Sequence, residues 1–293
     1  MSAEQEAPGR AVIVVSSHVA RGSVGNRAIV FALEHLGHPV WAVPTIMLPW
    51  HPGHGKSTRI VPPGDEFAAF LGDLERAPWL GEVGAVLSGY LGDAGQADAV
   101  AALVRTVKAR NPQALYLCDP VSGDAGGLYV PEATAMAMRD VLLPLADIAT
   151  PNRFELEWLA GRSLPDNHAL TQAAQELHPA TMLVTSAHAM MAGSIGNLLV
   201  TPRDVMLAEH RAIANPPNGT GDLASALLLA RLMQGQSPEK ALQMTAASVF
   251  ELVARAVRRG ADELMLETDA QSITHPMAMV QTRRLLAAGG RRA

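Results

Sequence analysis

The stretch NGTGDLASALLLARLMQG, residues 218–235, joins a glycine-containing turn directly to an apolar helix. Two glycines flank Thr220, and glycine allows backbone conformations that turn successive N–H groups toward one point. The helix predicted near residues 222–235 adds the positive end of its dipole. These residues therefore predict an anion-binding turn with one carboxylate, Asp222, beside it.

A carboxylate beside an anion site suits the transfer of a phosphoryl group to a hydroxyl. Asp222 would accept the hydroxyl proton, while the N–H groups of Gly219, Thr220 and Gly221 would stabilise charge on the phosphoryl group. Such donors contribute roughly 3 to 4 kcal/mol each in other chemistries. The same five residues are equally compatible with a helix cap at Asp222 and a simple glycine turn.

A second stretch, HPGHGKST at residues 51–58, looks at first like a nucleotide-binding loop. The strict phosphate-loop pattern requires a glycine five residues before Gly55, and that position holds Trp50. The residues that follow, TRIVPPGDE, contain β-branched residues and two prolines, so no helix is expected to begin at Lys56. The stretch is therefore not predicted to bind phosphate in that way.

Composition excludes several classes of protein. The chain has 293 residues, 48% of them hydrophobic, which supports a well-filled core. A net charge of -5 without a basic block argues against nucleic acid as a partner. One cysteine excludes a disulfide framework within one chain, and no apolar run is long enough to span a membrane. With no secretory signal at the N-terminus, a cytoplasmic protein is expected.

Short apolar runs alternate with segments of helical period, as in βαβ units around a mostly parallel sheet. Strands are predicted at residues 11–16, 39–43, 84–88, 114–119, 147–150 and 181–186, with a hairpin or edge pair at 194–200 and 205–211. Helices are predicted at residues 26–37, 65–74, 97–110, 135–146, 153–161, 169–177, 222–235 and 238–258. One domain over residues 1–293 is expected, with flexible ends at 1–10 and 285–293.

Polar residues follow several of the predicted strands. Ser17 and Tyr90 come at strand ends, where they can face a crevice or serve as a turn residue and a core tyrosine. Asp119 also ends a strand, and such carboxylates suit Mg²⁺ and its waters, whereas Asp124 also fits a solvated turn. Asn152 and Glu155, at a helix start, fit a simple capping arrangement.

Several stretches together carry a resemblance to a known family. They occur in this order: SSHVARGSVGNRA at 16–28, SGYLGD at 88–93, CDPVSGD at 118–124 followed by LYVPE, LADIATPNRFELEWLAG at 145–161, LVTSA at 183–187, and NGTGD. The last resembles the anion-hole signature of the ribokinase-like superfamily. Within it, the chain resembles the pyridoxal kinases, the vitamin B6 salvage enzymes, from residue 16 to about 235.

The resemblance implies a fold and an activity. The fold would be α/β, a ribokinase-like three-layer α/β/α sandwich with a mostly parallel central sheet. The activity would be transfer of the γ-phosphoryl of MgATP to the 5′-hydroxyl of pyridoxal, an alcohol acceptor. Pyridoxal and ATP would be the binding partners, and Mg²⁺ would accompany ATP. Related enzymes often respond to K⁺ and commonly form homodimers.

The resemblance also implies roles for particular residues. Asp222 would be the base, and Gly219, Thr220 and Gly221 the anion hole. Residues that would bind the substrate are Ser17, Val24, His51, Tyr90 and Asp222. Residues that would lie near ATP are Asp119, Asp124, Tyr129, Asn152, Glu155, Thr185 and Ser186, of which Asp119 and Glu155 would also lie near the metal. For Thr185 and Ser186 the alternative is simple strand termination.

The stretch at residues 51–58 departs from the family pattern. Related kinases often show SNHTGY there, and His51 and Gly53 match it, whereas Trp50, Pro52 and His54 replace asparagine, threonine and tyrosine. Proline has no donor, so at least one substrate hydrogen bond must be made differently. The stretch is expected to close over the substrate. A kinase for hydroxymethylpyrimidine or another small alcohol therefore stays open, as does a non-catalytic protein that binds B6 vitamers.

Overall fold

The computed structural model describes residues 9–287 and contains a nine-stranded sheet. Its order is β11-β10-β9-β8-β7-β4-β3-β1-β2. Six neighbouring strands are parallel: β2 (Val40–Leu48), β1 (Ala11–Val19), β3 (Val83–Ser88), β4 (Leu115–Cys118), β7 (Ile148–Ala149) and β8 (Thr181–Ala187). The sheet continues antiparallel through β9 (Ser194–Val200), β10 (Asp204–Arg211) and β11 (Gln281–Ala287). A separate short hairpin joins β5 (Gly123–Asp124) to β6 (Gly127–Leu128).

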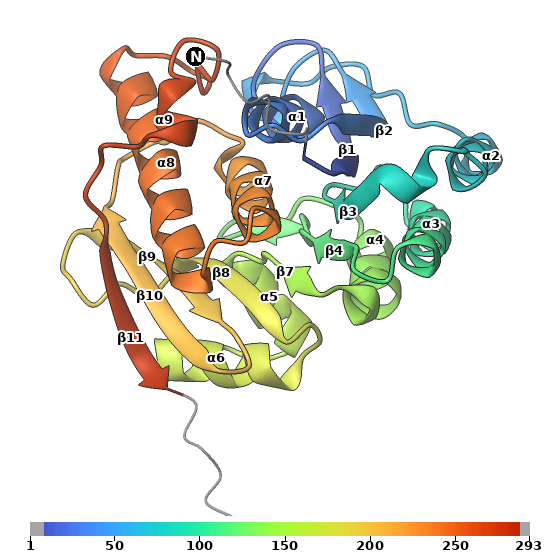
Figure 1. Ribbon diagram of the computed structural model, residues 1–293. Helices are drawn as coiled ribbons and strands as arrows, with labels where there is room; N and C mark the ends of the chain where they lie inside the picture. The colour runs from blue at the N-terminus through green and yellow to red at the C-terminus, as the bar shows by residue number, and fades with distance from the viewer. Residues whose placement is uncertain (1–8, 288–293) are drawn as a thin grey trace, which may run out of the picture.

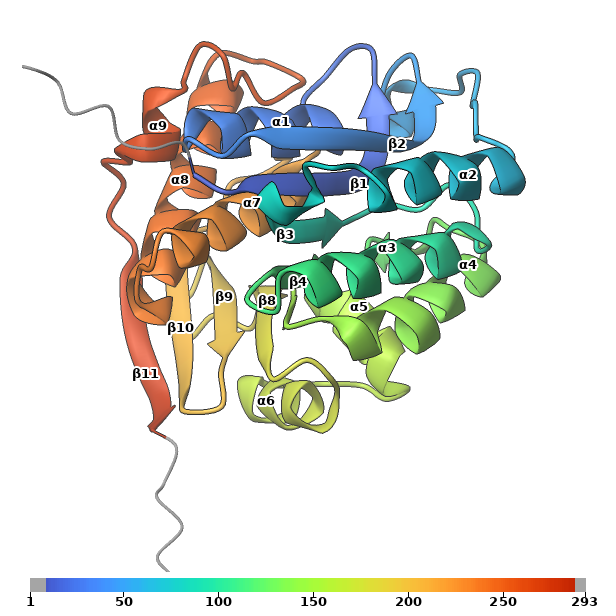
Figure 2. The same cartoon turned by 45° about the vertical axis from the view of Figure 1, so that its right-hand side comes forward.

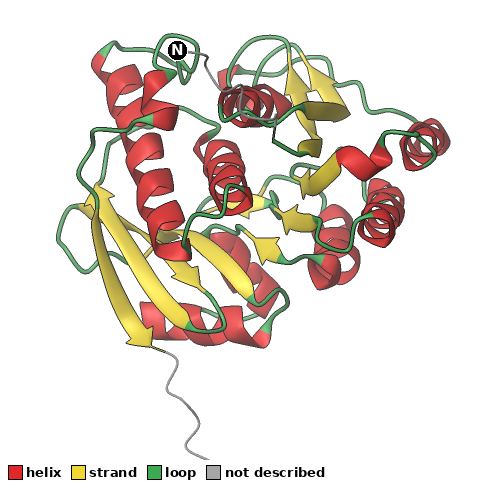
Figure 3. Ribbon diagram, in the orientation of Figure 1, coloured by secondary structure: helices red, strands yellow, loops and turns green. Residues whose placement is uncertain are grey.

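Helices cover both faces of the sheet (Figure 1; Figure 3). One layer consists of α1 (Asn26–His35), α7 (Thr220–Met233), α8 (Pro238–Arg258) and the short α9 (Gln271–Thr274). The other consists of α2 (Gly64–Glu75), α3 (Gln96–Arg110), α4 (Glu132–Ala137), α5 (Arg153–Ala160) and α6 (Asn167–Glu176). Figure 2 shows α2, α3 and α4 together on one side of the sheet. The result is a three-layer α/β/α sandwich.

The two cores follow from the alternation of side chains along a strand. In β1, Val12 and Val14 pack against α1 and α7, whereas Ile13 and Val15 pack against α2 and α3. All four side chains are fully buried. Successive strand residues point to opposite faces, so a continuous apolar run is the pattern of a strand covered by helices on both sides. This is why AVIVVS at residues 11–16 lacks polar alternation.

Most predicted elements are confirmed, including the hairpin, which is β9 and β10. The helix predicted over residues 135–146 is shorter and irregular: α4 ends at Ala137, and a π-helical turn and a 3₁₀ turn follow to Leu145. Pro144 lacks the backbone N–H that a regular helix needs there. As predicted, no helix begins at Lys56; the next helix is α2.

The expectation of a flexible end from residue 285 is wrong for Leu285–Ala287, which belong to β11. Their backbone pairs with β10, where Leu286 lies opposite Val205 and Ala287 opposite Asp204. Arg284 and Arg283 approach acids of β10 at 3.4 Å and 3.3 Å. A strand at the sheet edge with such charged side chains lacks the apolar signal of a central strand. Residues 1–8 and 288–293 lie outside the described residues.

The sheet brings the polar residues of the predicted site to one edge. Parallel strands have their carboxyl ends on the same side, and ligands of open α/β sheets bind there. Tyr90, Asp119, Asn152 and Thr185 lie at or just beyond such ends, of β3, β4, β7 and β8. Among residues 9–287, no helix combines the length and apolarity that a membrane crossing requires.

A buried arginine fastens α7 to its neighbours. Arg231 is 2% exposed and donates to the Thr245 and Ser248 hydroxyls at 3.0 Å and 2.8 Å, and to the Ile273 carbonyl at 2.8 Å. Burial lowers the pKa of the guanidinium to about 10, so it remains charged at neutral pH. Its three acceptors lie on α8 and α9. Because α7 carries Asp222, Arg231 also anchors the proposed active-site helix.

We expect Arg231→Ala to lower the free energy of unfolding by about 3 to 5 kcal/mol, because it opens a cavity and leaves buried acceptors unpaired. Urea unfolding followed by circular dichroism measures this change. Arg258→Ala, at an exposed position in the last turn of α8, is the control and should change stability by less than about 0.5 kcal/mol. A small effect of Arg231→Ala would contradict the anchoring role.

Candidate active site

All fifteen predicted site residues line one cleft of about 630 Å³ at the carboxyl edge of the sheet. They are Ser17, Val24, His51, Tyr90, Asp119, Asp124, Tyr129, Asn152, Glu155, Thr185, Ser186, Gly219, Thr220, Gly221 and Asp222. The structure therefore brings together residues that come from most of the chain. The role of each residue depends on its local geometry.

Asp222 stands in the first turn of α7, half-buried. Its Oδ2 accepts the Gly25 N–H at 2.9 Å. Burial raises the pKa of the carboxyl to about 6, while the Gly25 N–H lowers it. The group is therefore ionised at neutral pH and is a stronger base than an exposed aspartate. A mere capping role is not what the geometry shows, because the side chain bonds to another loop instead of its own helix.

The anion-hole amides lie beside Asp222. Gly219 precedes α7 with a φ of 89°, in the left-handed region that favours glycine. A Cβ at this position would lie 2.1 Å from the Ser23 carbonyl oxygen, so a side chain would displace the loop at residues 20–25. Among the described residues, the amides of Gly219, Thr220 and Gly221 have no hydrogen-bond acceptor. Such amides at a helix N-terminus are suited to an anion.

Asp119 is connected to the same helix by hydroxyl groups. Its Oδ2 accepts the Ser225 hydroxyl at 2.8 Å, and that hydroxyl lies 2.8 Å from Thr150 Oγ1. Burial and then repulsion from Asp222 raise the pKa of Asp119 to about 7, against the effect of the two hydroxyls. Ser225 stands one turn after Asp222 on α7. The hydroxyl pair therefore holds one carboxylate close to the other.

Glu155 and Asn152 form the capping box that the sequence suggested at the start of α5. The Asn152 side chain accepts the Glu155 N–H at 2.9 Å, and Glu155 Oε2 accepts the Asn152 N–H at 2.8 Å. Glu155 Oε1 accepts the N–H of Ser122 at 2.9 Å and of Gly123 at 3.4 Å. Both oxygens of this buried carboxylate therefore bind backbone amides, which fixes the loop after β4.

Asp119 repels two other acids of the cleft, Asp222 and Glu155. Burial and the neighbouring Asp119 raise the pKa of Glu155 to about 8, so Glu155 joins Asp119 and Asp222 as a carboxyl with a raised pKa. A bound divalent cation would relieve this repulsion. Within residues 9–287, no group of three His, Cys, Asp or Glu side chains has the geometry to hold a metal alone. Both Glu155 oxygens already accept backbone N–H groups, so a cation bound here would be held through its waters.

One end of the cleft has the character of a ring pocket. Val24 and Leu48 give it apolar walls, and both are nearly fully buried. Ser17, at 9% exposure, and Tyr90 add a hydroxyl and an aromatic ring. The combination of apolar walls and a few polar groups suits a flat heterocycle.

The loop at residues 51–59 closes this end of the cleft. His51, Pro52 and Gly53 line it, as expected, and His51 Nδ1 accepts the Gly53 N–H at 3.1 Å. Trp50 and Lys56 are not among the lining residues. The Trp50 side chain instead donates to the Gly55 carbonyl at 3.2 Å.

Arg59 is a lining residue that the sequence reasoning missed. Its guanidinium donates to the Tyr90 hydroxyl at 2.9 Å. A single arginine in a predicted loop belongs to no sequence pattern that would place it in the cleft.

Asp124 and Tyr129 lie at the exposed rim of the cleft. The Asp124 Oδ1 accepts the Gly126 N–H at 2.7 Å in the β5–β6 hairpin, which agrees with the alternative of an acidic turn. Tyr129 is 52% exposed and follows this hairpin. Both residues line the same cleft as the residues of the ring pocket.

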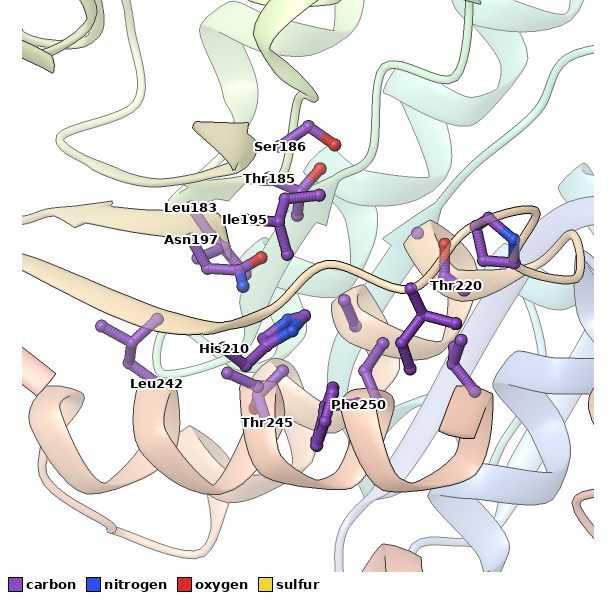
Figure 4. A pocket seen from close by; sticks show the side chains of 17 residues that line it. Leu183, Thr185, Ser186, Ile195, Asn197, His210, Thr220, Leu242, Thr245 and Phe250 are labelled. Atoms are coloured by element: carbon purple, nitrogen blue, oxygen red, sulfur yellow. The ribbon is translucent and has the colours of Figure 1, made fainter. Parts of the chain in front are cut away.

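A second, smaller cavity of about 120 Å³ adjoins the cleft and shares Thr185, Ser186, Pro216, Thr220 and Gly221 with it. Figure 4 shows it between β8, β9, β10 and α8. His210 and Phe250 form part of its wall, with ring centroids 4.9 Å apart, and burial lowers the pKa of His210. Asn197 and Thr245 add polar groups. Sequence reasoning missed this cavity because its residues lie in ordinary strands and helices.

Comparison with known proteins agrees with this geometry. A sequence model of the family described as Phosphomethylpyrimidine kinase matches residues 81–267. The pyridoxal kinase PdxY of Rubrobacter xylanophilus is 39% identical over 285 residues, covering 94% of this chain and 98% of that protein. The PdxY of Corynebacterium diphtheriae is 34% identical over 280 residues, covering 94% and 99%.

Solved structures give the same result. Pyridoxal kinase from Leishmania donovani, in complex with ADP and pyridoxamine, superposes with a TM-score of 0.88 at 26% identity, covering 94% of this chain and all of that one. A putative phosphomethylpyrimidine kinase from Bacteroides thetaiotaomicron, at 20% identity and a TM-score of 0.86, shares the fold. Fold and cleft thus define the ribokinase-like class. Within that class, the chain belongs to the pyridoxal kinase family.

The raised pKa of Asp119 predicts a pH-dependent stability. Because its pKa is higher in the folded state than in the unfolded state, its contribution is present below about pH 4 and is lost as the pH rises through about 7. We expect the free energy of unfolding of ligand-free wild type to fall by about 1 to 3 kcal/mol relative to that of Asp119→Asn as the pH rises from 5 to 8, because the variant lacks this carboxyl group. Urea unfolding at both pH values measures the difference.

Asp124→Asn is the matched control, since it removes an exposed carboxylate from the same cleft. It should leave the pH dependence of stability close to that of wild type. Equal pH dependence in Asp119→Asn and wild type would show that Asp119 does not carry the electrostatic strain of the cleft.

Proposed function

We propose that the protein is a pyridoxal kinase, which transfers the γ-phosphoryl group of ATP to the 5′-hydroxyl of pyridoxal and forms pyridoxal 5′-phosphate. One observation carries the proposal. The half-buried base Asp222 stands beside three amides without protein acceptors, between a ring pocket and an adjoining smaller cavity. The identity with pyridoxal kinases over 94% of the chain supports pyridoxal as the acceptor.

The base acts from a fixed position. The Gly25 N–H holds Asp222 Oδ2, which leaves the other carboxylate oxygen to accept the proton of a hydroxyl in the cleft. With a pKa of about 6, the carboxylate is mostly ionised at neutral pH. The hydroxyl that loses its proton attacks the γ-phosphorus, and the bond to the β–γ bridging oxygen breaks as ADP leaves.

The N–H groups of Gly219, Thr220 and Gly221 would donate hydrogen bonds to the oxygens of the transferred phosphoryl group. Their direction and the dipole of α7 favour negative charge at this point. Because the amides belong to the backbone, they need no rearrangement as charge develops. The substitution of Gly219 by any other residue would push Ser23 away and disturb both the hole and the loop that holds Asp222.

The base of the nucleotide would occupy the smaller cavity. Its walls are mostly apolar, with Leu183, Ile195 and Phe250, which suits a flat base. The hydroxyls of Thr185 and Ser186 lie on the wall shared with the cleft, where the phosphates would pass. Asn152, Asp124 and Tyr129 would border the phosphates from the opposite side.

Magnesium, bound with ATP, supplies positive charge that neutralises the phosphates. Asp119 and Glu155 would hold it through its waters, since both Glu155 oxygens already accept backbone N–H groups. Potassium dependence, a homodimer and a cytoplasmic location complete the proposal, supported by the resemblance to pyridoxal kinases. Activity with and without K⁺ tests the potassium dependence, and light scattering of the purified protein tests the homodimer.

A kinase for hydroxymethylpyrimidine is the second candidate. The observation that favours it is the presence of Pro52 and Arg59 in the ring pocket, since Pro52 stands where related pyridoxal kinases carry a hydrogen-bonding threonine. The match to the Phosphomethylpyrimidine kinase family model agrees with this alternative as well. Both candidates use the same base and the same anion hole, and they differ only in the acceptor.

We expect MgATP-dependent formation of pyridoxal 5′-phosphate by the purified protein and a fall in kcat of at least about 10³-fold in Asp222→Asn, because the amide cannot accept the proton. Pyridoxal, pyridoxine and hydroxymethylpyrimidine are compared as acceptors. Exclusive use of hydroxymethylpyrimidine would establish the second candidate. Binding of pyridoxal without turnover of any acceptor would indicate a binding protein instead.

The pH profile of kcat/KM provides an independent check on the base. With the pKa of Asp222 near 6, activity should rise tenfold per pH unit below that value and level off above it. Asp124→Asn, which leaves Asp222 untouched, should keep this limb. A profile without a limb between about pH 5 and 7 would remove Asp222 from the role of base.

A further inference from the structure

Glu263 is a buried acid outside the cleft, in the segment between α8 and α9. It is 9% exposed and does not line the cleft. A carboxylate buried this far costs free energy unless it is well paired, so its partners indicate its role. Those partners belong to two loops that do line the cleft.

The first partner loop is at residues 20–25. Glu263 Oε2 accepts the Ser23 N–H at 3.3 Å, and Arg21 lies 3.6 Å from Oε1. The Ser23 hydroxyl also donates to the Leu264 carbonyl at 2.7 Å, next to Glu263 in sequence. This loop continues into Val24, a wall of the ring pocket, and Gly25, the partner of Asp222.

The second partner loop is at residues 51–55. His54 Nε2 lies 2.8 Å from Glu263 Oε1. His54 itself does not line the cleft, but its neighbours His51, Pro52 and Gly53 do. The Cβ position of Gly53 lies 3.3 Å from the Asn218 amide, so this loop also reaches the start of the anion-hole turn.

Gly22 shows how closely the first loop fits the acid. It has a φ of 110°, and a Cβ there would lie 2.5 Å from Glu263 Oε1. Only a residue without a side chain allows the loop to lie this close to the carboxylate. The backbone of this loop therefore packs directly against the Glu263 carboxylate.

We propose that Glu263 is a positioning residue that holds both loops of the acceptor pocket in place at once. One carboxylate fixes the loop that carries Val24 and Gly25 through Ser23, and the loop that carries His51 through His54. The pocket for the alcohol acceptor is thereby closed from outside, whereas the nucleotide cavity makes no contact with Glu263. The expected effect of Glu263 on kinetics rests on the proposed function, whereas its expected effect on the two loops does not.

The kinetic consequence separates the two substrates. We expect Glu263→Ala to raise KM for the acceptor about tenfold and to leave KM for ATP within about twofold, because the two loosened loops contribute residues to the cleft and none to the nucleotide cavity. Glu263→Gln keeps an acceptor oxygen for His54 or Ser23 and should restore part of the loss. Glu267→Ala, which removes an exposed acid of the same segment, is the control and should match wild type.

The structural consequence is measured by amide hydrogen exchange of the full-length variants. In Glu263→Ala, both residues 20–25 and residues 51–55 should exchange faster than in wild type. In His54→Ala, which changes a surface loop and leaves Ser23 in contact with Glu263, only residues 51–55 should do so. Circular dichroism confirms that each variant is folded.

Each outcome decides the proposal. Faster exchange in both loops of Glu263→Ala and a selective rise in acceptor KM support it. Unchanged exchange in either loop overturns it, as does an equal rise in KM for both substrates. If wild type phosphorylates no pyridoxal, the proposed function fails, and the exchange experiment still tests Glu263.

Discussion

The hydrogen bond from the Gly25 N–H to Asp222 joins two cleft-lining segments that lie 197 residues apart in the chain. Gly25 directly precedes α1, whereas Asp222 lies in the first turn of α7. Because α1 and α7 pack side by side in one core, this contact is supported by buried apolar surface. The base, the ring pocket and the anion hole keep their relative positions only while those two helices stay packed.

The buried acids of the same cleft lower the stability of the fold. Asp119, Glu155 and Asp222 each have a raised pKa, and burial is the first cause for all three. A fold selected for stability alone would pair or remove such acids. Their hydrogen bonds to Ser225, to backbone amides and to Gly25 hold them in position without neutralising them. A cation or a proton that arrived with the substrates would relieve this electrostatic strain.

Sequence reasoning reached the layered fold because apolar runs such as residues 11–16 are unambiguous signals of strands buried on both faces. Because the carboxyl ends of parallel strands meet at one edge, strand ends indicated Ser17, Tyr90 and Asp119, while the resemblance to pyridoxal kinases supplied others such as Val24 and Tyr129. Sequence reasoning missed β11, whose arginines pair with acids of β10 instead of forming an apolar run. It also missed Arg59 and Glu263, because long-range contacts of charged side chains leave no local pattern.

The boundary between the two cavities would allow both proposed substrates to be bound at the same time. Thr185, Ser186, Thr220 and Gly221 border both spaces, so each cavity has room for its own occupant while the other is filled. Neither occupant has to leave before the second arrives, and the phosphoryl group has a direct path from one to the other past the start of α7. With the two substrates placed as proposed, the phosphoryl group would be transferred within a ternary complex. Initial-rate plots would then intersect, and no phosphorylated form of the protein would accumulate between the two half-reactions.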